Sequence, residues 1–208
     1  LASRASVSVA LNYDHGQEKK YLIKAIDDGF SSVMIDASRL DFENNIAMTK
    51  EIADYAHAHG ASAEGEIGCL GASEGGEFTG ESMYTDPKQA KEFFERTGID
   101  ALAISIGTSH GNYPEGMVPK FDIERLREIK RLTNAPLVLH GGSGSGEENI
   151  LNSVKNGINK INVGCDFMNA NRDAAAKLLR ENPEINYFDL IHQTEKESVG
   201  LVKYYIGL

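Results

Sequence analysis

One rhythm runs through the sequence and constrains the fold more than any other feature. Short apolar runs rich in β-branched residues alternate with amphipathic stretches of helical length. Because no hairpin signal joins neighbouring runs, we expect parallel strands connected by helical crossovers. The expected strands are residues 7–11, 32–35, 61–67, 101–106, 136–140 and 160–163. The expected helices are residues 18–28, 43–59, 87–97, 123–131 and 147–156, followed by two more at 167–180 and 187–204.

The composition excludes several classes of protein. Among 208 residues, 41% are hydrophobic and 25% charged, as in an ordinary globular domain. A formal charge of -10 argues against nucleic acid or an anionic membrane surface as the main partner. No apolar run approaches the roughly 20 residues that span a bilayer. Two cysteines cannot build a disulfide scaffold, which favours a reducing cytoplasm.

Polar and glycine-rich segments follow the strands, which is where parallel α/β folds place their active sites. We therefore expect a (β/α)8 TIM barrel, although only six βα units are visible and a complete barrel takes about 250 residues. The expected arrangement is a single domain over residues 1–208, made of strands three to eight and C-terminal helices. On this interpretation the first two βα units are absent, and residue 1 lies in the helix before the third strand.

Three histidines, His15, His110 and His140, end strands and are each followed by glycine. Converging imidazoles with nearby carboxylates predict a catalytic zinc site with an open position. The alternative is that each histidine caps its strand through backbone hydrogen bonds. Asp14, directly before His15, is a candidate proton shuttle, or else a group that orients a ligand histidine.

Two kinds of glycine-rich segment add to this prediction. The acidic segment 68–77 is long for a βα connection, so it is either a lid over the barrel mouth or a plain surface excursion. Segments 140–144 and 162–165 follow the seventh and eighth expected strands, where barrels commonly bind phosphate through backbone N–H groups and a helix N-terminus.

Six segments then match one known family in order and spacing. They are NYDHG at 12–16, VMIDAS at 33–38, EGEIG at 64–68, IGTSHGNY at 106–113, LVLHGGSG at 137–144 and KINVG at 160–164. Together they resemble the class II, zinc-dependent fructose/tagatose-bisphosphate aldolases, and the resemblance covers nearly the whole chain.

The resemblance implies a role for each matching residue. His15, His110 and His140 would bind zinc, and Glu66 would be a nearby carboxylate of the metal shell. Asp14 would act as acid and base at the cleaved bond, and Glu74 would exchange a proton with the nucleophilic carbon of dihydroxyacetone phosphate. Asn162 would contact the enediolate. The residues expected to surround the phosphate are Gly111, Gly141, Ser143, Gly164 and Cys165.

The implied function is a lyase of carbohydrate metabolism: reversible aldol cleavage of fructose 1,6-bisphosphate or a close relative to dihydroxyacetone phosphate and an aldehyde. Alternatives are a tagatose-bisphosphate or deoxy-ketogluconate-phosphate aldolase, and a non-catalytic sugar-phosphate-binding barrel remnant. The family also implies a homodimer or homotetramer and allows a monovalent cation near the phosphate. Two departures stand out. Cys165 replaces the usual Thr, and no Arg or Lys lies between Asn182 and Glu195, where the family's distal-phosphate arginine is expected.

Overall fold

The structure is a computed structural model that describes residues 4–68, 71–72, 84–111, 113 and 116–208. For Gly71, Ala72 and His110 only the backbone is described. Within these residues, none of the helices combines the length and the apolar character needed to cross a bilayer.

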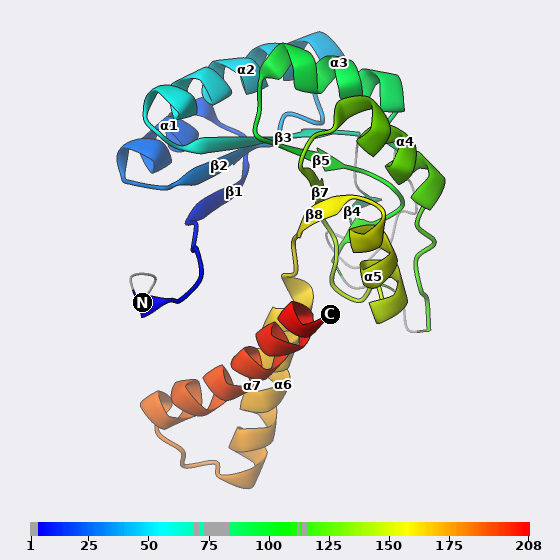
Figure 1. Ribbon diagram of the computed structural model, residues 1–208. Helices are drawn as coiled ribbons and strands as arrows, with labels where there is room; N and C mark the ends of the chain where they lie inside the picture. Colours follow the sequence, from blue (N-terminus) through cyan, green and yellow to red (C-terminus); the bar gives the residue numbers. More distant parts are fainter. Residues whose placement is uncertain (1–3, 69–70, 73–83, 112, 114–115) are drawn as a thin grey trace.

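A six-stranded parallel sheet forms the centre of the fold, with strand order β1-β2-β3-β5-β7-β8 (Figure 1). Its strands are β1 (Asn12–Gly16), β2 (Ser32–Ile35), β3 (Ser62–Ile67), β5 (Ala101–Ile104), β7 (Leu137–Leu139) and β8 (Ile158–Ile161). A separate parallel pair joins β4 (Gly71–Ala72) to β6 (Ser109–His110). The parallel crossovers expected from the sequence are thus confirmed for all six strands of the sheet.

Contacts between side chains at its two edge strands show that the sheet is strongly curved. Asn162, directly after β8, donates from its amide to both carboxylate oxygens of Asp14 on β1, at 3.2 Å each. In a flat sheet, the steps of about 4.8 Å between neighbouring strands would hold these edges about 24 Å apart. The molecule therefore contains an α/β half-barrel sheet.

Five helices cover the convex side of this sheet (Figure 1). They are α1 (Lys19–Asp27), α2 (Phe42–Ala58), α3 (Pro87–Thr97), α4 (Ile123–Thr133) and α5 (Glu147–Lys155). Carboxylates cap the first turns of α2, α3 and α4, and Gly98 ends α3 in the left-handed conformation with φ 70°.

The core lies between these helices and the outer face of the sheet. Strand residues such as Val33 and Leu102 pack there against Leu22, Phe93 and Leu126, all with no exposed surface. The alternate strand residues point to the concave side, where Met34, Ala103 and Val138 form a small separate cluster. Since Glu64 pairs with Met34 and Lys160 with Val138 in the strand register, both charged residues also belong to the concave side.

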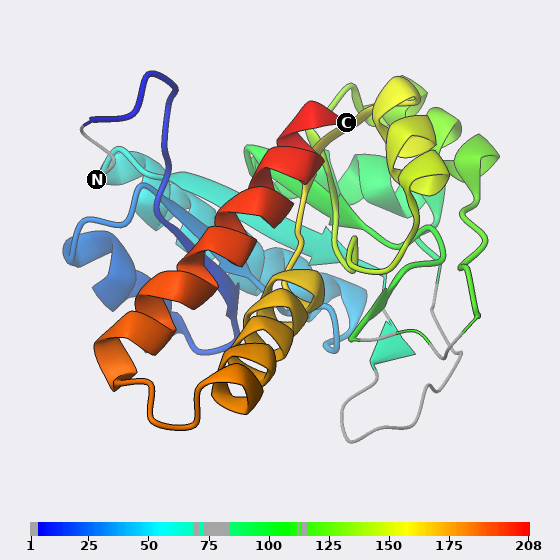
Figure 2. The ribbon, with the colours of Figure 1, turned by 90° about the horizontal axis from the view of Figure 1, so that it is seen from below.

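Two long helices follow β8 and form a hairpin that projects away from the sheet (Figures 1 and 2). These are α6 (Cys165–Glu181) and α7 (Tyr187–Gly207), both wholly within the described residues. No residue of α6 is buried, and only Thr194 and Ser198 of α7 are.

The first expected strand was placed wrongly. Residues 7–11 form no strand, and Val7, Val9 and Leu11 are exposed. β1 begins at Asn12, because Asn12 and Tyr13 are the residues that pair with Ser32 and Val33 of β2. The last strand, β8, likewise begins two residues before the expected 160.

Candidate metal and anion site

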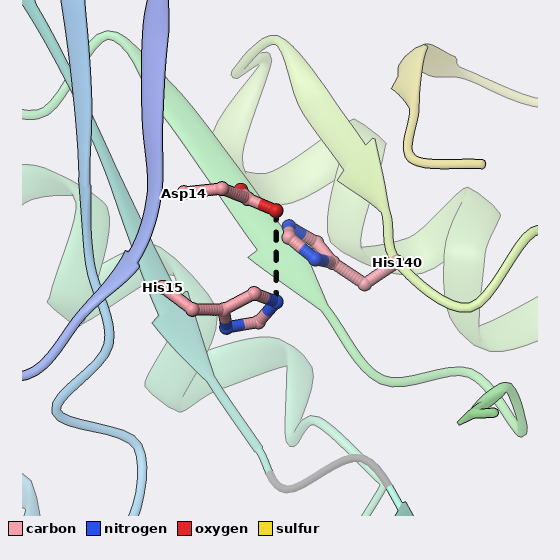
Figure 3. Close-up of side chains that lie close together, drawn as sticks. All are labelled: Asp14, His15 and His140. Atoms are coloured by element: carbon pink, nitrogen blue, oxygen red, sulfur yellow. Dashed lines mark ion pairs between the residues drawn. The ribbon is translucent and has the colours of Figure 1, made fainter. Parts of the chain in front are cut away.

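The end of β1 brings two neighbouring side chains to the same place. In a regular strand, Asp14 and His15 would point to opposite faces. Here the register of β1 shifts between Tyr13 and Gly16, and His15 has φ 48°, a left-handed conformation uncommon outside glycine. This irregular backbone turns both side chains toward His140 (Figure 3), and such strain is a recurring property of functional sites.

A carboxylate orients His15. Its Nδ1 lies 2.9 Å from Asp36 Oδ2, and Asp36 Oδ1 accepts a second hydrogen bond of 2.7 Å from the Ser38 hydroxyl. Burial alone would raise the pKa of Asp36, but the hydrogen bonds from His15 and Ser38 lower it to about 2. Burial lowers the pKa of His15, yet the bond to Asp36 and the charge of Asp14 raise it overall. With Nδ1 directed at Asp36, Nε2 faces Asp14 Oδ2 at 4.0 Å.

A second carboxylate orients His140, which follows β7 and is 1% exposed. His140 Nε2 lies 2.8 Å from Glu64 Oε1 on β3, and Glu64 Oε2 accepts a 2.8 Å bond from Lys160 Nζ on β8. Burial would raise the pKa of Glu64, but His140 and Lys160 hold it below its usual value. The other ring nitrogen, Nδ1, faces the Asn162 amide at 3.2 Å.

The two imidazoles and Asp14 form one cluster, shown in Figure 3. The rings of His15 and His140 meet edge to face, with 4.7 Å between their centroids. One ligand atom from each of Asp14, His15 and His140 lies within 4.8 Å of the others, close enough to share a metal ion. Each imidazole also has a carboxylate partner, the usual arrangement around a metal-binding histidine.

Glu66 lies close to His15 and Asp36 and is 3% exposed. Among the described residues its Oε2 atom has no hydrogen-bond partner. Burial and the nearby charge of Asp36 raise its pKa to about 8. One carboxylate oxygen of Glu66 lies within 4.8 Å of ligand atoms of His15 and Asp36. A buried carboxylate with an oxygen that lacks a donor among the described residues is the kind of group that a cation would satisfy.

Beside the cluster, two segments form a cradle for an anion. Gly141 has φ 68°, and a Cβ atom there would lie 2.4 Å from the backbone oxygen of Ser109, so only glycine fits this close approach. The Ser143 Oγ atom accepts from the backbone N–H groups of Gly164 and Asp166, at 3.1 and 3.2 Å. Because that oxygen takes two donors at the start of α6, the hydroxyl hydrogen is directed to another acceptor.

A cavity of about 200 Å³ joins the two parts of the site. Nine of the twelve residues predicted from the sequence line it, and Met168 does so as well. The nine are Asp14, His15, Gly111, His140, Gly141, Ser143, Asn162, Gly164 and Cys165.

Three predicted residues are placed differently. Glu66 lies close to His15 but does not line the cavity. Glu74 lies outside the described residues, and the His110 side chain is not described although its backbone forms part of β6. The remaining histidines serve elsewhere: His57 pairs with Asp100 at 2.8 Å, His59 contacts the Tyr55 carbonyl at 2.8 Å, and His192 lies on the surface near Glu195.

Sequence reasoning missed the partners of the two imidazoles. Asp36 and Glu64 stood out as polar residues near strand ends, but no local pattern assigned them to particular histidines. Lys160 was noticed only within the KINVG segment. Its partner Glu64 is 96 positions away, so the pairing depends on the curvature of the sheet.

Comparison with known proteins agrees with this geometry. The family model for class-II fructose-bisphosphate aldolase matches residues 1–208. A fructose-bisphosphate aldolase from Geobacillus stearothermophilus is 42% identical over 181 residues, covering 86% of this chain and 62% of the relative. The chain thus spans less than two thirds of that relative's length.

Two solved structures share the fold. The YdjI aldolase from Escherichia coli K12 is 36% identical, with a TM-score of 0.80 over 95% of this chain and 67% of its own. A Coccidioides immitis structure, described as a candidate fructose-1,6-bisphosphate aldolase, is 31% identical. It has a TM-score of 0.84 over 99% of this chain and 72% of its own.

Proposed function

Because this chain belongs to the class II fructose-bisphosphate aldolase family, we propose that the protein catalyses reversible aldol cleavage of a phosphorylated ketose. The products would be dihydroxyacetone phosphate and an aldehyde. The observation that carries the proposal is the single cavity in which Asp14, His15 and His140 meet beside the cradle of Gly141 and Ser143. This reaction needs one cavity that activates the carbonyl group and binds the phosphate group of the same substrate.

The residues present fit a divalent metal ion such as zinc. Imidazole nitrogens and carboxylate oxygens are its usual ligands, and His15 and His140 each have a carboxylate on the opposite ring nitrogen. The Oε2 atom of Glu66, which has no hydrogen-bond partner among the described residues, supports the same conclusion. We propose His15, His140 and, by resemblance, His110 as ligands. When bound, such an ion polarises the ketose carbonyl and stabilises the negative charge left when the carbon–carbon bond breaks.

The chain's own groups would handle the proton and the phosphate. Asp14 is exposed to the cavity, and the Asn162 amide holds its carboxylate, so it is placed to take the proton from the hydroxyl at the cleaved bond. The Ser143 hydroxyl would bind the phosphate beside the N-terminus of α6, whose dipole favours an anion, with a monovalent cation as an additional counter-charge. The proton exchange assigned to Glu74 remains part of the proposal.

The identity of the ketose is a finer proposal. Fructose 1,6-bisphosphate is favoured by the family, with tagatose bisphosphate or a deoxy-ketogluconate phosphate as alternatives. Since the segment between Asn182 and Glu195 has no Arg or Lys, we expect weak discrimination for the phosphate at the far end of the sugar.

A zinc-supplemented cleavage assay across these phosphorylated ketoses tests the proposal. We expect chelation to abolish cleavage and borohydride, which traps Schiff bases, to leave it unchanged. Asp14→Asn should lower the rate about 10²–10⁴-fold while phosphate binding is retained. Normal cleavage by metal-free protein would refute the metal mechanism, and tight phosphate binding without any cleavage would favour the non-catalytic sugar-phosphate-binding alternative.

Two further proposals concern the assembly. The curvature of the half-barrel supports a complete (β/α)8 barrel in which two more strands lie between β8 and β1. The exposed apolar side chains of α6 and α7, Phe188 at 83% and Ile206 at 80% among them, support a homodimer or homotetramer. Sedimentation of wild type and Phe188→Glu tests the second proposal, because the charge should shift the oligomer toward monomer.

A further inference from the structure

We infer that Lys160 is a positioning residue for the ligand histidine His140, acting through Glu64. This inference rests on the proposed metal centre. It goes beyond that proposal by assigning a role to a cation that lines neither the metal cluster nor the anion cradle.

The chain of contacts has two links. Lys160 Nζ donates to Glu64 Oε2 at 2.8 Å, and Glu64 Oε1 accepts from His140 Nε2 at 2.8 Å. The two carboxylate oxygens are therefore divided between the lysine and the imidazole. With Oε2 held by Lys160, the carboxyl plane is fixed, and Oε1 keeps one position relative to the imidazole.

Burial makes the lysine necessary. The Glu64 side chain is 3% exposed and His140 is 1% exposed, so water cannot stabilise the carboxylate. A buried carboxylate is costly unless a charge or hydrogen bonds compensate it. A His140 ring that donates from Nε2 and binds metal through Nδ1 carries no net charge. Lys160 therefore supplies the positive charge that compensates the Glu64 carboxylate.

The position of Lys160 in the sheet favours this role over a purely local one. β3 and β8 are separated by β5 and β7 in the strand order, so the Lys160–Glu64 pair crosses the concave side of the sheet. Lys160 is also two residues before Asn162, whose amide contacts both Asp14 and His140 Nδ1. β8 and the residue that follows it thus contact His140 in two ways: Lys160 through Glu64, and Asn162 directly.

The alternative role is structural, with the ion pair only holding the curvature of the sheet. The two roles predict different results. A structural pair affects the stability of the metal-free protein and leaves the intrinsic affinity for metal unchanged. A positioning pair changes the affinity for metal, because an imidazole that loses its oriented carboxylate is a weaker and less ordered ligand.

The experiment measures zinc dissociation constants by competition with a chromophoric chelator, together with thermal unfolding of the metal-free proteins. We expect Lys160→Met to weaken zinc binding about 10–100-fold, the usual effect of losing the partner of a ligand histidine. Lys160→Arg should recover most of the affinity, because it keeps the charge. The matched control Lys19→Met removes an exposed ion pair with Glu51 and should bind zinc like wild type.

A double mutant tests the route through Glu64. If Lys160 acts through that carboxylate, Glu64→Gln with Lys160→Met should bind zinc no more weakly than Glu64→Gln alone. Additive losses would overturn the inference, as would a Lys160→Met protein that binds zinc like wild type but unfolds at a lower temperature. If Lys160→Met does not fold, Lys160→Gln gives the same comparison with a hydrogen-bond donor retained.

The assay also separates this inference from the proposed function. Wild-type protein that binds no zinc would overturn both. Wild-type protein that binds zinc, with unchanged affinity in the Lys160 variants, would overturn only the role of Lys160.

Discussion

The half-barrel and the helical hairpin are stabilised in different ways. In the half-barrel, large apolar side chains such as Phe93, Leu102 and Leu126 have no exposed surface. In the hairpin, the buried residues are the polar Thr194 and Ser198, and the Ser198 hydroxyl donates to Asn171 Oδ1 across the two helices at 2.8 Å. The half-barrel therefore derives its stability from the hydrophobic effect, whereas the hairpin depends on helix propensity and a few polar contacts.

The site uses both regions. The metal cluster and its carboxylates come from strands of the half-barrel, while the anion cradle is completed by the first residues of α6. We therefore expect changes in the half-barrel to affect folding and metal binding, and changes at the start of the hairpin to affect mainly the binding of phosphate.

The largest expected difference comes from matched phenylalanines. Phe93→Ala should lower the free energy of unfolding by about 3–5 kcal/mol, because it leaves a cavity in the core. Phe188→Ala, in the hairpin and 83% exposed, should change it by less than about 0.5 kcal/mol. Urea unfolding of both variants, at a protein concentration low enough for the chain to be monomeric, measures the contrast. Equal losses in the monomeric protein would contradict it.

The second prediction concerns the buried carboxylate of the half-barrel. In metal-free protein the pKa of Glu66 is about 8, above the value of about 4.3 in an unfolded chain. Between these values the unfolded state loses a proton that the folded state keeps, so stability falls as pH rises, by up to about 1.4 kcal/mol per pH unit.

Glu66→Gln should remove this contribution and stabilise the metal-free protein at neutral and alkaline pH. Thermal unfolding from pH 5 to pH 9 with a chelator present measures the effect. The exposed Glu197→Gln in α7 is the control and should leave the pH profile unchanged. A wild-type profile in Glu66→Gln would show that this carboxyl is not perturbed.

The third prediction addresses the junction between the regions. The Tyr205 hydroxyl of α7 donates to Asp166 Oδ2 at 2.5 Å, and the same oxygen accepts from the Gly144 N–H at 3.1 Å. Tyr205→Phe should cost about 1.5–3 kcal/mol, typical of a hydrogen bond to a charged group, and weaken binding of inorganic phosphate. Tyr204→Phe removes an exposed 3.3 Å contact and should have little effect on either measurement.

The smallest expected effect lies inside the hairpin. Ser198→Ala removes the bond to Asn171, worth about 0.5–1.5 kcal/mol, but alanine is the better helix former by up to about 0.5 kcal/mol. We expect a net loss below about 1 kcal/mol in urea unfolding. A loss above about 2 kcal/mol would contradict the view that single polar contacts stabilise the hairpin less than buried apolar side chains stabilise the half-barrel.

The sequence predicted most of the fold because local signals agree with the tertiary structure. The helix at 87–97 was predicted with the bounds of α3, since Asp86 caps it and Gly98 ends it. The strand at 32–35 was predicted with its observed bounds because buried parallel strands form continuous apolar runs, and the strand at 61–67 was predicted within one residue. Residues 7–11 also form an apolar run, but they are not a strand, because Asn12 and Tyr13 are the residues that pair with β2. Which residues pair with a neighbouring strand cannot be read from one segment.

The site could be predicted as a set of residues but not as an arrangement. Nine of the residues predicted at or near strand ends line one cavity. The register shift of β1 and the left-handed backbone of His15 have no signal in the sequence, although together they explain how Asp14 and His15 reach one cluster. The pairing of Glu64 with both His140 and Lys160 likewise depends on how the sheet curves.

The bond between Asp14 and Asn162 has a consequence for how the protein folds. These residues are 148 positions apart in a chain of 208 residues, so their contact closes a very long loop. Closing a long loop carries an entropic cost that nearby contacts must first offset, so such contacts form late. The proposed metal cluster is therefore assembled at the end of folding. Zinc uptake during refolding, followed with a chromophoric chelator, would report completion of the native chain rather than its early collapse.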